Sequence, residues 1–375
     1  MNDGAPPRGG LGANGAKRRP RWGRRTPYGI RRDFRDRAPE TRHAAATYAA
    51  LDLGTNNCRL LVARPTADGF RVVDAFSRII RLGEGVAGSG RISEAAIARA
   101  VEALLVCREK MHLRGVERAR LIATAACRAA QNGEEFRSSV AREAGLELEI
   151  IDSATEARLA ATGCTELFDP AANGVILFDI GGGSSELVRL NRSPPGPGGP
   201  PTPDIVDWAS LPVGVVTLAE RYGGKVVSHE NYDAMVGEVA TFVDRFAADH
   251  RSQLGTFHTL GTSGTVTTIA GVHLGLPRYD RNRVDGCWLG TDQARAVTAR
   301  LLAASYQERV AEPCIGKERA DLALAGCAIL EAMLKMWPCD RLRVADRGLR
   351  EGILATLMAE DGVHRSDPRR GYWRR

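Results

Sequence analysis

Short apolar runs alternate with amphipathic stretches along the chain, a pattern that predicts strands alternating with helices. The runs that predict strands are TYAALDLG, CRLLVARP, FRVVDAFSRIIRL, LELEIID and GVILFDI, and RARLIATAACR predicts a strand that leads into a helix. Residues 93–115 have apolar positions at helical spacing, with Ser93 as a candidate N-cap and Gly115 beyond the end. The pattern therefore favours an α/β fold.

The strand-turn-strand pattern occurs twice. GVILFDIGGGSSELVRL restarts the pattern of the first strands, and Asp52-Leu53-Gly54 and Asp179-Ile180-Gly181 each place an acid before a glycine turn, 127 residues apart. Such a weak internal repeat predicts a duplicated fold with a cleft between its halves.

The length of 375 residues favours about two domains, because one compact core rarely exceeds roughly 250–300 residues. We expect the first domain at residues 46–153 and the second at 154–341. The proline- and glycine-rich stretch 191–204 is expected to be a flexible hairpin tip, because strand-like sequence follows it.

The net charge of +7 lies in the two ends of the chain. Residues 1–42 carry a net charge of +8 and residues 361–375 carry +3, so residues 43–360 carry −4. Residues 1–45 are rich in Arg, Gly and Pro and have little apolar content, which predicts a disordered tail. We also expect residues 361–375 to form a disordered tail. The first tail is either an arm that contacts polyanions such as RNA or a solvated extension.

Composition excludes several classes of protein. No apolar run approaches the ~18 residues that span a bilayer, and no apolar segment of a secretory signal is present. The eight cysteines are scattered and form no C-x-x-C pair, which argues against a zinc ribbon or a disulfide scaffold. We expect a cytoplasmic protein with reduced thiols and no membrane contact.

Three loops offer small residues where a backbone could approach an anion closely. The residues that we expect to bind phosphate are Gly54, Thr55, Asn56 and Asn57 in DLGTNN, Gly181, Gly182, Gly183 and Ser184 in DIGGGSSE, and Gly261, Thr262 and Ser263 in GTSGT. The last loop leads into a predicted helix, whose N-terminus favours an anion. One such loop could be a tight turn, but three in one chain favour phosphate binding.

Acidic residues accompany two of these loops. Asp52 and Asp179 end strands, where a carboxylate can hold Mg²⁺ directly or through its waters, although an aspartate there can also cap a turn. Glu186 follows the three glycines and two serines, where a plain phosphate loop needs no acid. The predicted site therefore combines phosphate with a divalent cation.

Eight ordered motifs over about residues 47–360 resemble the exopolyphosphatase and guanosine pentaphosphate phosphohydrolase (Ppx/GppA) family. They are AALDLGTNNCRLLVARP, ATAACRAAQNGEEF, IIDSATEARLAATG, FDIGGGSSELV, LPVGVVTLAERY, GTSGTVTTIAG, ERADLALAGCAIL and RGLREGIL. The resemblance implies the actin, Hsp70 and sugar-kinase superfold, with duplicated domains around a phosphate-binding cleft. It also implies that a last helix, about 342–360, returns to the first domain.

The resemblance also implies roles for individual residues. Glu156 matches the catalytic glutamate that activates the attacking water, while Asp179 and Glu186 match carboxylates that hold Mg²⁺ and help to place that water. Arg128 matches an arginine that contacts phosphate. The family often has Ser-Gly-Glu-Glu-Ala at this point, whereas DSATEA keeps only the last glutamate of that pattern. The contacts that support Glu156 are therefore expected to differ from those of the family.

We therefore expect a Mg²⁺-dependent hydrolase that releases orthophosphate from a chain end of polyphosphate. Guanosine pentaphosphate presents the same terminal anhydride and is the alternative substrate. An ATPase or kinase of the same superfold, and a binding protein without catalysis, are less favoured readings. The chain resembles the short two-domain form of the family, which weakens an expectation of high processivity, and a homodimer is left open.

Overall fold

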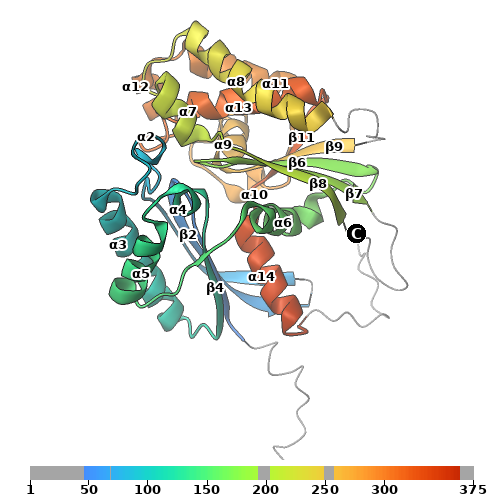
Figure 1. Ribbon diagram of the computed structural model, residues 1–375. Helices are drawn as coiled ribbons and strands as arrows, with labels where there is room; N and C mark the ends of the chain where they lie inside the picture. The colour runs from blue at the N-terminus through green and yellow to red at the C-terminus, as the bar shows by residue number, and fades with distance from the viewer. Residues whose placement is uncertain (1–45, 68, 193–202, 249–256, 364–375) are drawn as a thin grey trace, which may run out of the picture. The chain divides into compact units, whose positions relative to one another are not determined.

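The computed structural model describes residues 46–67, 69–192, 203–248 and 257–363 (Figure 1). These residues lie within one compact unit, Pro39–Arg375. The predicted N-terminal tail, the tip of the 191–204 stretch at 193–202 and residues 364–375 lie outside the described residues. The predicted domain boundaries at 153/154 and 341/342 stay predictions.

The first sheet has the strand order β3-β2-β1-β4-β5. Its strands are β1 (Tyr48–Leu53), β2 (Asn57–Thr66), β3 (Gly69–Ile79), β4 (Arg118–Ala123) and β5 (Glu149–Ile150). Strand β1 pairs antiparallel with β2 and parallel with β4, while β2 and β3 form an antiparallel pair. The helices that follow in the chain are α2 (Val86–Ser89), α3 (Glu94–Leu113), α4 (Ala125–Ala129), α5 (Gly133–Ala144) and α6 (Ser153–Cys164).

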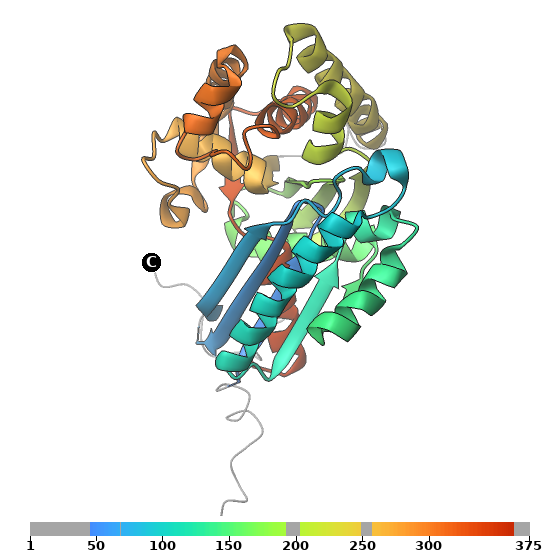
Figure 2. The same cartoon turned by 90° about the vertical axis from the view of Figure 1, so that its left-hand side faces the viewer.

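Both faces of strand β1 are buried. Leu51 and Leu53 belong to the apolar cluster that includes residues of α3 and α5, and Figure 2 shows α3 lying across this face of the sheet. Tyr48 and Ala50 point to the other face and pack in the cluster that includes α14 (Leu349–Glu360). A strand covered on both sides needs apolar residues on both, which explains its nearly unbroken apolar sequence.

The second sheet has the order β10-β11-β9-β6-β7-β8. Its strands are β6 (Gly174–Ile180), β7 (Ser185–Arg192), β8 (Pro203–Leu211), β9 (Phe257–Thr262), β10 (Trp288–Gly290) and β11 (Arg341–Ala345). The remaining helices are η1 (Thr165–Leu167), α7 (Val215–Tyr222), α8 (His229–Ala248), α9 (Gly264–His273), α10 (Arg281–Val284), α11 (Thr291–Ala303), α12 (Tyr306–Ala311) and α13 (Ala323–Met336). The largest apolar cluster joins this sheet to α7, α8, α9, α11 and α13.

The two sheets share a topology. Strands β6, β7 and β8 form an antiparallel meander and β6 pairs parallel with β9, as β1, β2, β3 and β4 do in the first sheet. The predicted α/β class with a duplicated, actin-like arrangement is therefore confirmed. The repeat places the loop after β1 and the loop after β6 in equivalent positions.

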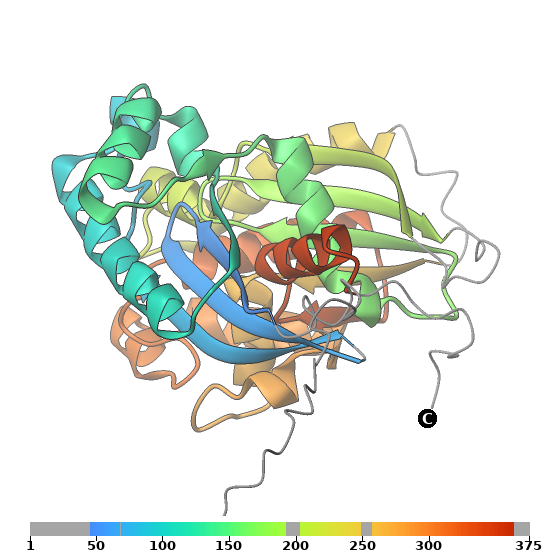
Figure 3. The same cartoon turned by 90° about the horizontal axis from the view of Figure 1, so that it is seen from below.

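Helices α6 and α14 cross in very close contact between the two sheets (Figure 3). A β-carbon on Gly163 would overlap the carbonyl oxygen of Gly348, and one on Gly352 would overlap that of Leu159. Helix α14 packs on β1, but it is shorter than the expected 342–360: it begins at Leu349, and Arg341–Ala345 form strand β11 of the second sheet. The glycines are required here because the two backbones touch.

Candidate active site

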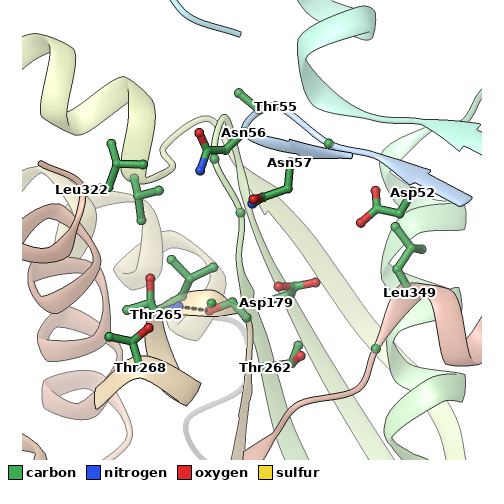
Figure 4. Close-up of a pocket in the computed structure, with 18 of the residues that line it drawn as sticks. Asp52, Thr55, Asn56, Asn57, Asp179, Thr262, Thr265, Thr268, Leu322 and Leu349 are labelled. Atoms are coloured by element: carbon green, nitrogen blue, oxygen red, sulfur yellow. Dashed lines mark hydrogen bonds between the residues drawn. The ribbon is translucent and has the colours of Figure 1, made fainter. Parts of the chain in front are cut away.

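A cavity lies between the two sheets and is lined by both repeat loops (Figure 4). Its lining includes the predicted residues Asp52, Gly54, Thr55, Asn56, Asn57, Glu156, Asp179, Gly181, Gly182, Gly183, Ser184, Glu186, Thr262 and Ser263. The duplicated turns and the α6 glutamate, which are far apart in sequence, are therefore brought to one place.

The first loop is a tight turn held by its own backbone. The amide of Gly54 donates to the carbonyl of Asn57 at 2.9 Å, and the amides of Ile80 and Gly83 donate to the carbonyls of Asn56 and Thr55, both at 2.9 Å. The side-chain oxygens Oδ1 of Asn56 and Asn57 are buried without a hydrogen-bond partner in the described structure. Buried polar atoms are normally paired, so these two oxygens fit a donor or cation that enters the cavity.

The second loop lies against the first one. A β-carbon on Gly182 would lie 2.9 Å from Thr55 Cβ, and one on Gly183 would lie 2.8 Å from Thr55 Oγ1, so only glycine fits. The carbonyls of Gly181 and Gly182 accept hydrogen bonds from the first amides of α7, at 3.0 and 2.9 Å. Because C=O and N–H point in opposite directions across a trans peptide, the amides of Gly182 and Gly183 point away from α7. Among the described residues they have no backbone hydrogen-bond partner, so they can donate to an anion.

Asp179 and Glu186 lie directly opposite each other on neighbouring strands β6 and β7, and therefore on the same face of the sheet. Burial raises the pKa of Asp179 to about 7, and repulsion from Glu186 and Asp52 adds to the rise. Burial also raises the pKa of Glu186, although the hydroxyls of Ser184 and Ser210 donate to its Oε1 at 2.7 and 3.0 Å. Nearby like charges at low dielectric are costly, so this cluster favours a bound cation.

Glu156 lies in the first turn of α6, whose N-cap Asp152 accepts a hydrogen bond from the amide of Thr155 at 2.7 Å. It is only 9% exposed, and burial together with the charge of Glu186 raises its pKa to about 8. Such a shifted carboxylate facing a cavity is suited to proton transfer near neutral pH.

Two predicted residues lie outside the cavity lining. The Arg128 guanidinium donates from Nη1 to Oε2 of Glu156 at 2.7 Å and to the carbonyl of Ile151 at 2.9 Å, so it holds the glutamate. At Gly261, a β-carbon would lie 2.6 Å from the Phe178 ring, so this glycine is explained by packing. The predicted contact of both residues with phosphate stays a prediction.

Four cavity-lining arginines were not identified by sequence reasoning: Arg59, Arg319, Arg347 and Arg350. Nη2 of Arg59 and Nη1 of Arg319 each lie 3.7 Å from the position of a β-carbon on Gly264, at the start of α9. Arg350 is close enough to Asp52 to oppose the rise in its pKa that burial causes. Each of the four lies within one of the eight motifs, but none has a local pattern that marks it as a site residue.

The donor set fits Mg²⁺ shared with a substrate. Among the residues that the structure describes, no group of three or more His, Cys, Asp or Glu side chains could hold a metal ion by itself. Mg²⁺ in proteins commonly takes one or two carboxylates and completes its shell with waters and substrate phosphates. The facing carboxylates of Asp179 and Glu186, with the unpaired Oδ1 atoms of Asn56 and Asn57 in the same cavity, match that pattern.

In the described part of the chain, no helix is both long enough and apolar enough to cross a bilayer.

Comparison with known proteins identifies a family and relatives for this chain. A model of the Ppx/GppA phosphatase family matches residues 61–361. A Haemophilus influenzae protein named a candidate exopolyphosphatase is 26% identical over 320 residues, which cover 85% of this chain and 94% of that protein. An Aeromonas hydrophila protein named guanosine-5'-triphosphate,3'-diphosphate pyrophosphatase is 27% identical over 320 residues, and the chain spans 61% of its length.

Solved structures that resemble this chain include members of the same family. The crystal structure of an Aquifex aeolicus Ppx/GppA family member is 28% identical, with a TM-score of 0.69 over 84% of this chain and 98% of that one. An exopolyphosphatase from Cytophaga hutchinsonii has a TM-score of 0.74 at 23% identity, over 84% of this chain and 98% of its own, which shows a likeness of fold.

Proposed function

The chain belongs to the Ppx/GppA phosphatase family, and we propose that it releases orthophosphate from the terminal phosphoanhydride of inorganic polyphosphate. One observation carries this proposal: Glu156, Asp179 and Glu186 line the same cavity as the two glycine loops. The loops suit phosphate, and the buried acids suit a cation and a water. A phosphoanhydride hydrolase needs these parts together.

The terminal phosphate would lie between the two loops, where amides of Gly182 and Gly183 donate to its oxygens. Arg59 and Arg319 would neutralise the charge on the adjoining phosphates. Glu156 would accept a proton from the attacking water, because its raised pKa makes it a competent base near neutral pH. The phosphoanhydride is a good leaving group, so positioning and charge neutralisation supply most of the catalysis.

Asp179 and Glu186 would hold Mg²⁺, with Asp52 facing the same cavity. When bound, the cation supplies further neutralisation of the phosphate charge. The buried carboxylates have raised pKa values without it, so the residues themselves favour its presence.

A second candidate substrate is guanosine pentaphosphate, and one feature of the cavity favours it. The lining includes an apolar group drawn from α9, α11, α13 and the turns before α13: Ile269, Leu301, Ile315, Leu322, Ala323 and Cys327. An apolar surface beside phosphate loops suits a nucleoside. Polyphosphate has no group that would use this surface, so the two substrates predict different roles for it.

The deciding experiment compares initial rates of orthophosphate release from long polyphosphate, tripolyphosphate and guanosine pentaphosphate with Mg²⁺. The Glu156→Gln variant is expected to lose activity by roughly 100- to 10,000-fold, because a neutral amide cannot accept the proton of the water. The matched control is Glu102→Gln, which removes an exposed glutamate from helix α3 and should keep the parent's rate.

Each outcome has a clear meaning. Equal rates for Glu156→Gln and the parent would overturn the catalytic role and favour a binding protein. Release of ADP during incubation with ATP and candidate sugars would favour a kinase. A preference for guanosine pentaphosphate over every polyphosphate would replace the first candidate substrate with the second.

A further inference from the structure

A second pocket adjoins the cavity. It lies between the end of β3 and the turn before α13, and it is lined by Ser77, Arg78, Ile79, Ile315, Gly316, Lys317, Glu318 and Arg319. Ile315 and Arg319 line both the cavity and this pocket, so the two spaces meet at these side chains. A ligand that extends past Arg319 would enter the second pocket.

The second pocket is basic. Arg78, Lys317 and Arg319 face a single acid, Glu318, in its lining. No carboxylate of the described residues forms an ion pair with any of these three cations, although many arginines elsewhere do so. Cations gathered without carboxylate partners repel one another, which favours an anionic ligand.

The wall of the pocket is fixed across the two sheets. Arg81, just beyond β3, donates to both carboxylate oxygens of Asp321 at 2.9 and 3.1 Å, and to the carbonyl of Glu318 at 3.2 Å. This pairing ties the turn that carries Lys317 to the strand that carries Arg78. The basic side chains are therefore presented from a preformed surface, which lowers the entropy cost of binding.

The cations form a series that leads out of the cavity. Arg59 and Arg319 face the same point at the start of α9, and Arg319 also belongs to the outer pocket with Arg78 and Lys317. A linear polyanion with one charge per repeat could contact each of them in turn. The two phosphate loops hold only its end.

We propose that the outer pocket binds phosphate groups beyond those held at the glycine loops, and so makes affinity depend on the number of phosphates. The inference rests on the proposed function in placing the scissile end at the loops. Two sources supply such groups: the distal part of a polyphosphate chain, or the 3'-diphosphate of guanosine pentaphosphate.

The test uses the double variant Arg78→Gln/Lys317→Gln, combined with Glu156→Gln so that ligands bind without turnover. Dissociation constants are measured for long polyphosphate, tripolyphosphate, guanosine pentaphosphate and GTP. For long polyphosphate we expect weakening of roughly 2- to 30-fold, as for two exposed ion pairs, and a much smaller change for tripolyphosphate. The effect should fade at high salt, because exposed charges are screened.

The matched control is Arg71→Gln, which removes an exposed arginine from the same strand β3 outside the pocket. Both pocket residues are exposed, so the variants should fold, and unchanged thermal midpoints check this. The proposal is overturned if Arg71→Gln weakens the binding of long polyphosphate as much as the double variant does. It is also overturned if the double variant weakens the binding of long polyphosphate and tripolyphosphate equally. If the double variant weakens the binding of guanosine pentaphosphate but not of GTP or polyphosphate, the pocket holds the 3'-diphosphate of guanosine pentaphosphate.

Binding separates this proposal from the proposed function. If the parent hydrolyses no polyphosphate but the double variant still binds the long chain more weakly than its control does, the proposed function fails and the pocket stands. If the parent hydrolyses all chain lengths and the double variant binds every ligand like the control, the function stands and the pocket proposal fails.

Discussion

Arg128 and Glu156 form an ion pair at the edge of the site, with 2.7 Å between Nη1 and Oε2. The guanidinium lowers the pKa of Glu156, while burial and Glu186 raise it, and the balance lies at about 8. A residue that sets the pKa of a base acts through that base. In this structure Arg128 is therefore a positioning residue, which holds the Glu156 carboxylate and lowers its pKa.

Replacing Arg128 should move the pH dependence of catalysis. In the parent, kcat/KM is expected to rise with pH up to about 8 as Glu156 loses its proton. Arg128→Ala removes a charge that favours the ionised form, so the ascending limb should move to higher pH. Arg128→Lys should restore part of the shift without the fork of donors. An ascending limb at the same pH in all three proteins would contradict the argument.

Asp179 should destabilise the folded protein at alkaline pH when no cation is bound. An aspartate in an unfolded chain has a pKa of about 3.9, and in the folded protein the pKa is about 7. The stability that this difference contributes is complete below pH 3.9 and is lost as the pH rises through 7.

Asp179→Asn should therefore raise the thermal midpoint at pH 8 by at least about 2 °C without divalent cations, while abolishing activity. Added Mg²⁺ should raise the midpoint of the parent more than that of the variant. Asp233→Asn, an exposed change on α8, should leave both midpoints near the parent's. A variant less stable than the parent at pH 8 would be evidence against this reasoning.

At the scale of elements, the crossing of α6 and α14 is the least tolerant contact. The backbones approach so closely that Gly163 and Gly352 admit no β-carbon. In the sequence, these glycines could be read as weak points of two helices, because a glycine in a helix usually lowers stability. Only the tertiary contact shows why they are needed.

Gly352→Ala should lower the free energy of unfolding by about 1–3 kcal/mol or more, because the methyl group overlaps the Leu159 carbonyl. The control is Gly237→Ala in α8, where a β-carbon meets nothing within 4 Å. That change should raise stability by up to about 1 kcal/mol, as expected for alanine in a helix. Chemical denaturation of both variants measures the difference, and equal effects would show that the helices can separate without cost.

The sequence predicted the helices, the strands and the residues of the repeated turns better than it predicted which distant residues meet in the cavity. Asp52 and Asp179 could be found because each ends an apolar strand before a glycine turn. Glu156 required the family resemblance, since an acid at a helix start is common on protein surfaces. Arg59 and Arg319 could not be found, because they meet at Gly264 only after the two sheets pack.

At the scale of the whole molecule, the cavity has walls from both sheets, and Arg81 and Glu220 connect them outside it. Glu220 Oε1 accepts from the amide of Gly85 at 2.8 Å, and Arg81 pairs with Asp321. A ligand in this cavity contacts both halves at once. Its binding free energy should therefore stabilise them together.

Tripolyphosphate with Mg²⁺ should raise the thermal midpoint of Glu156→Gln in a single transition. At a ligand concentration about 100 times the dissociation constant, the gain is about 2.7 kcal/mol. Differential scanning calorimetry with and without ligand measures it, and sulfate at the same ionic strength is the control. Two separate transitions, of which only one responds, would show that the halves unfold independently.

The return of α14 to the first sheet has a consequence for synthesis on the ribosome. The face of the sheet that carries Tyr48, Ala50 and Ile122 is covered by a helix that begins at Leu349, more than two hundred residues after Ile122. At about 5–20 residues per second, that face waits on the order of ten seconds or longer for its cover. The nascent chain therefore exposes an apolar surface that a chaperone can bind until translation reaches the last helix.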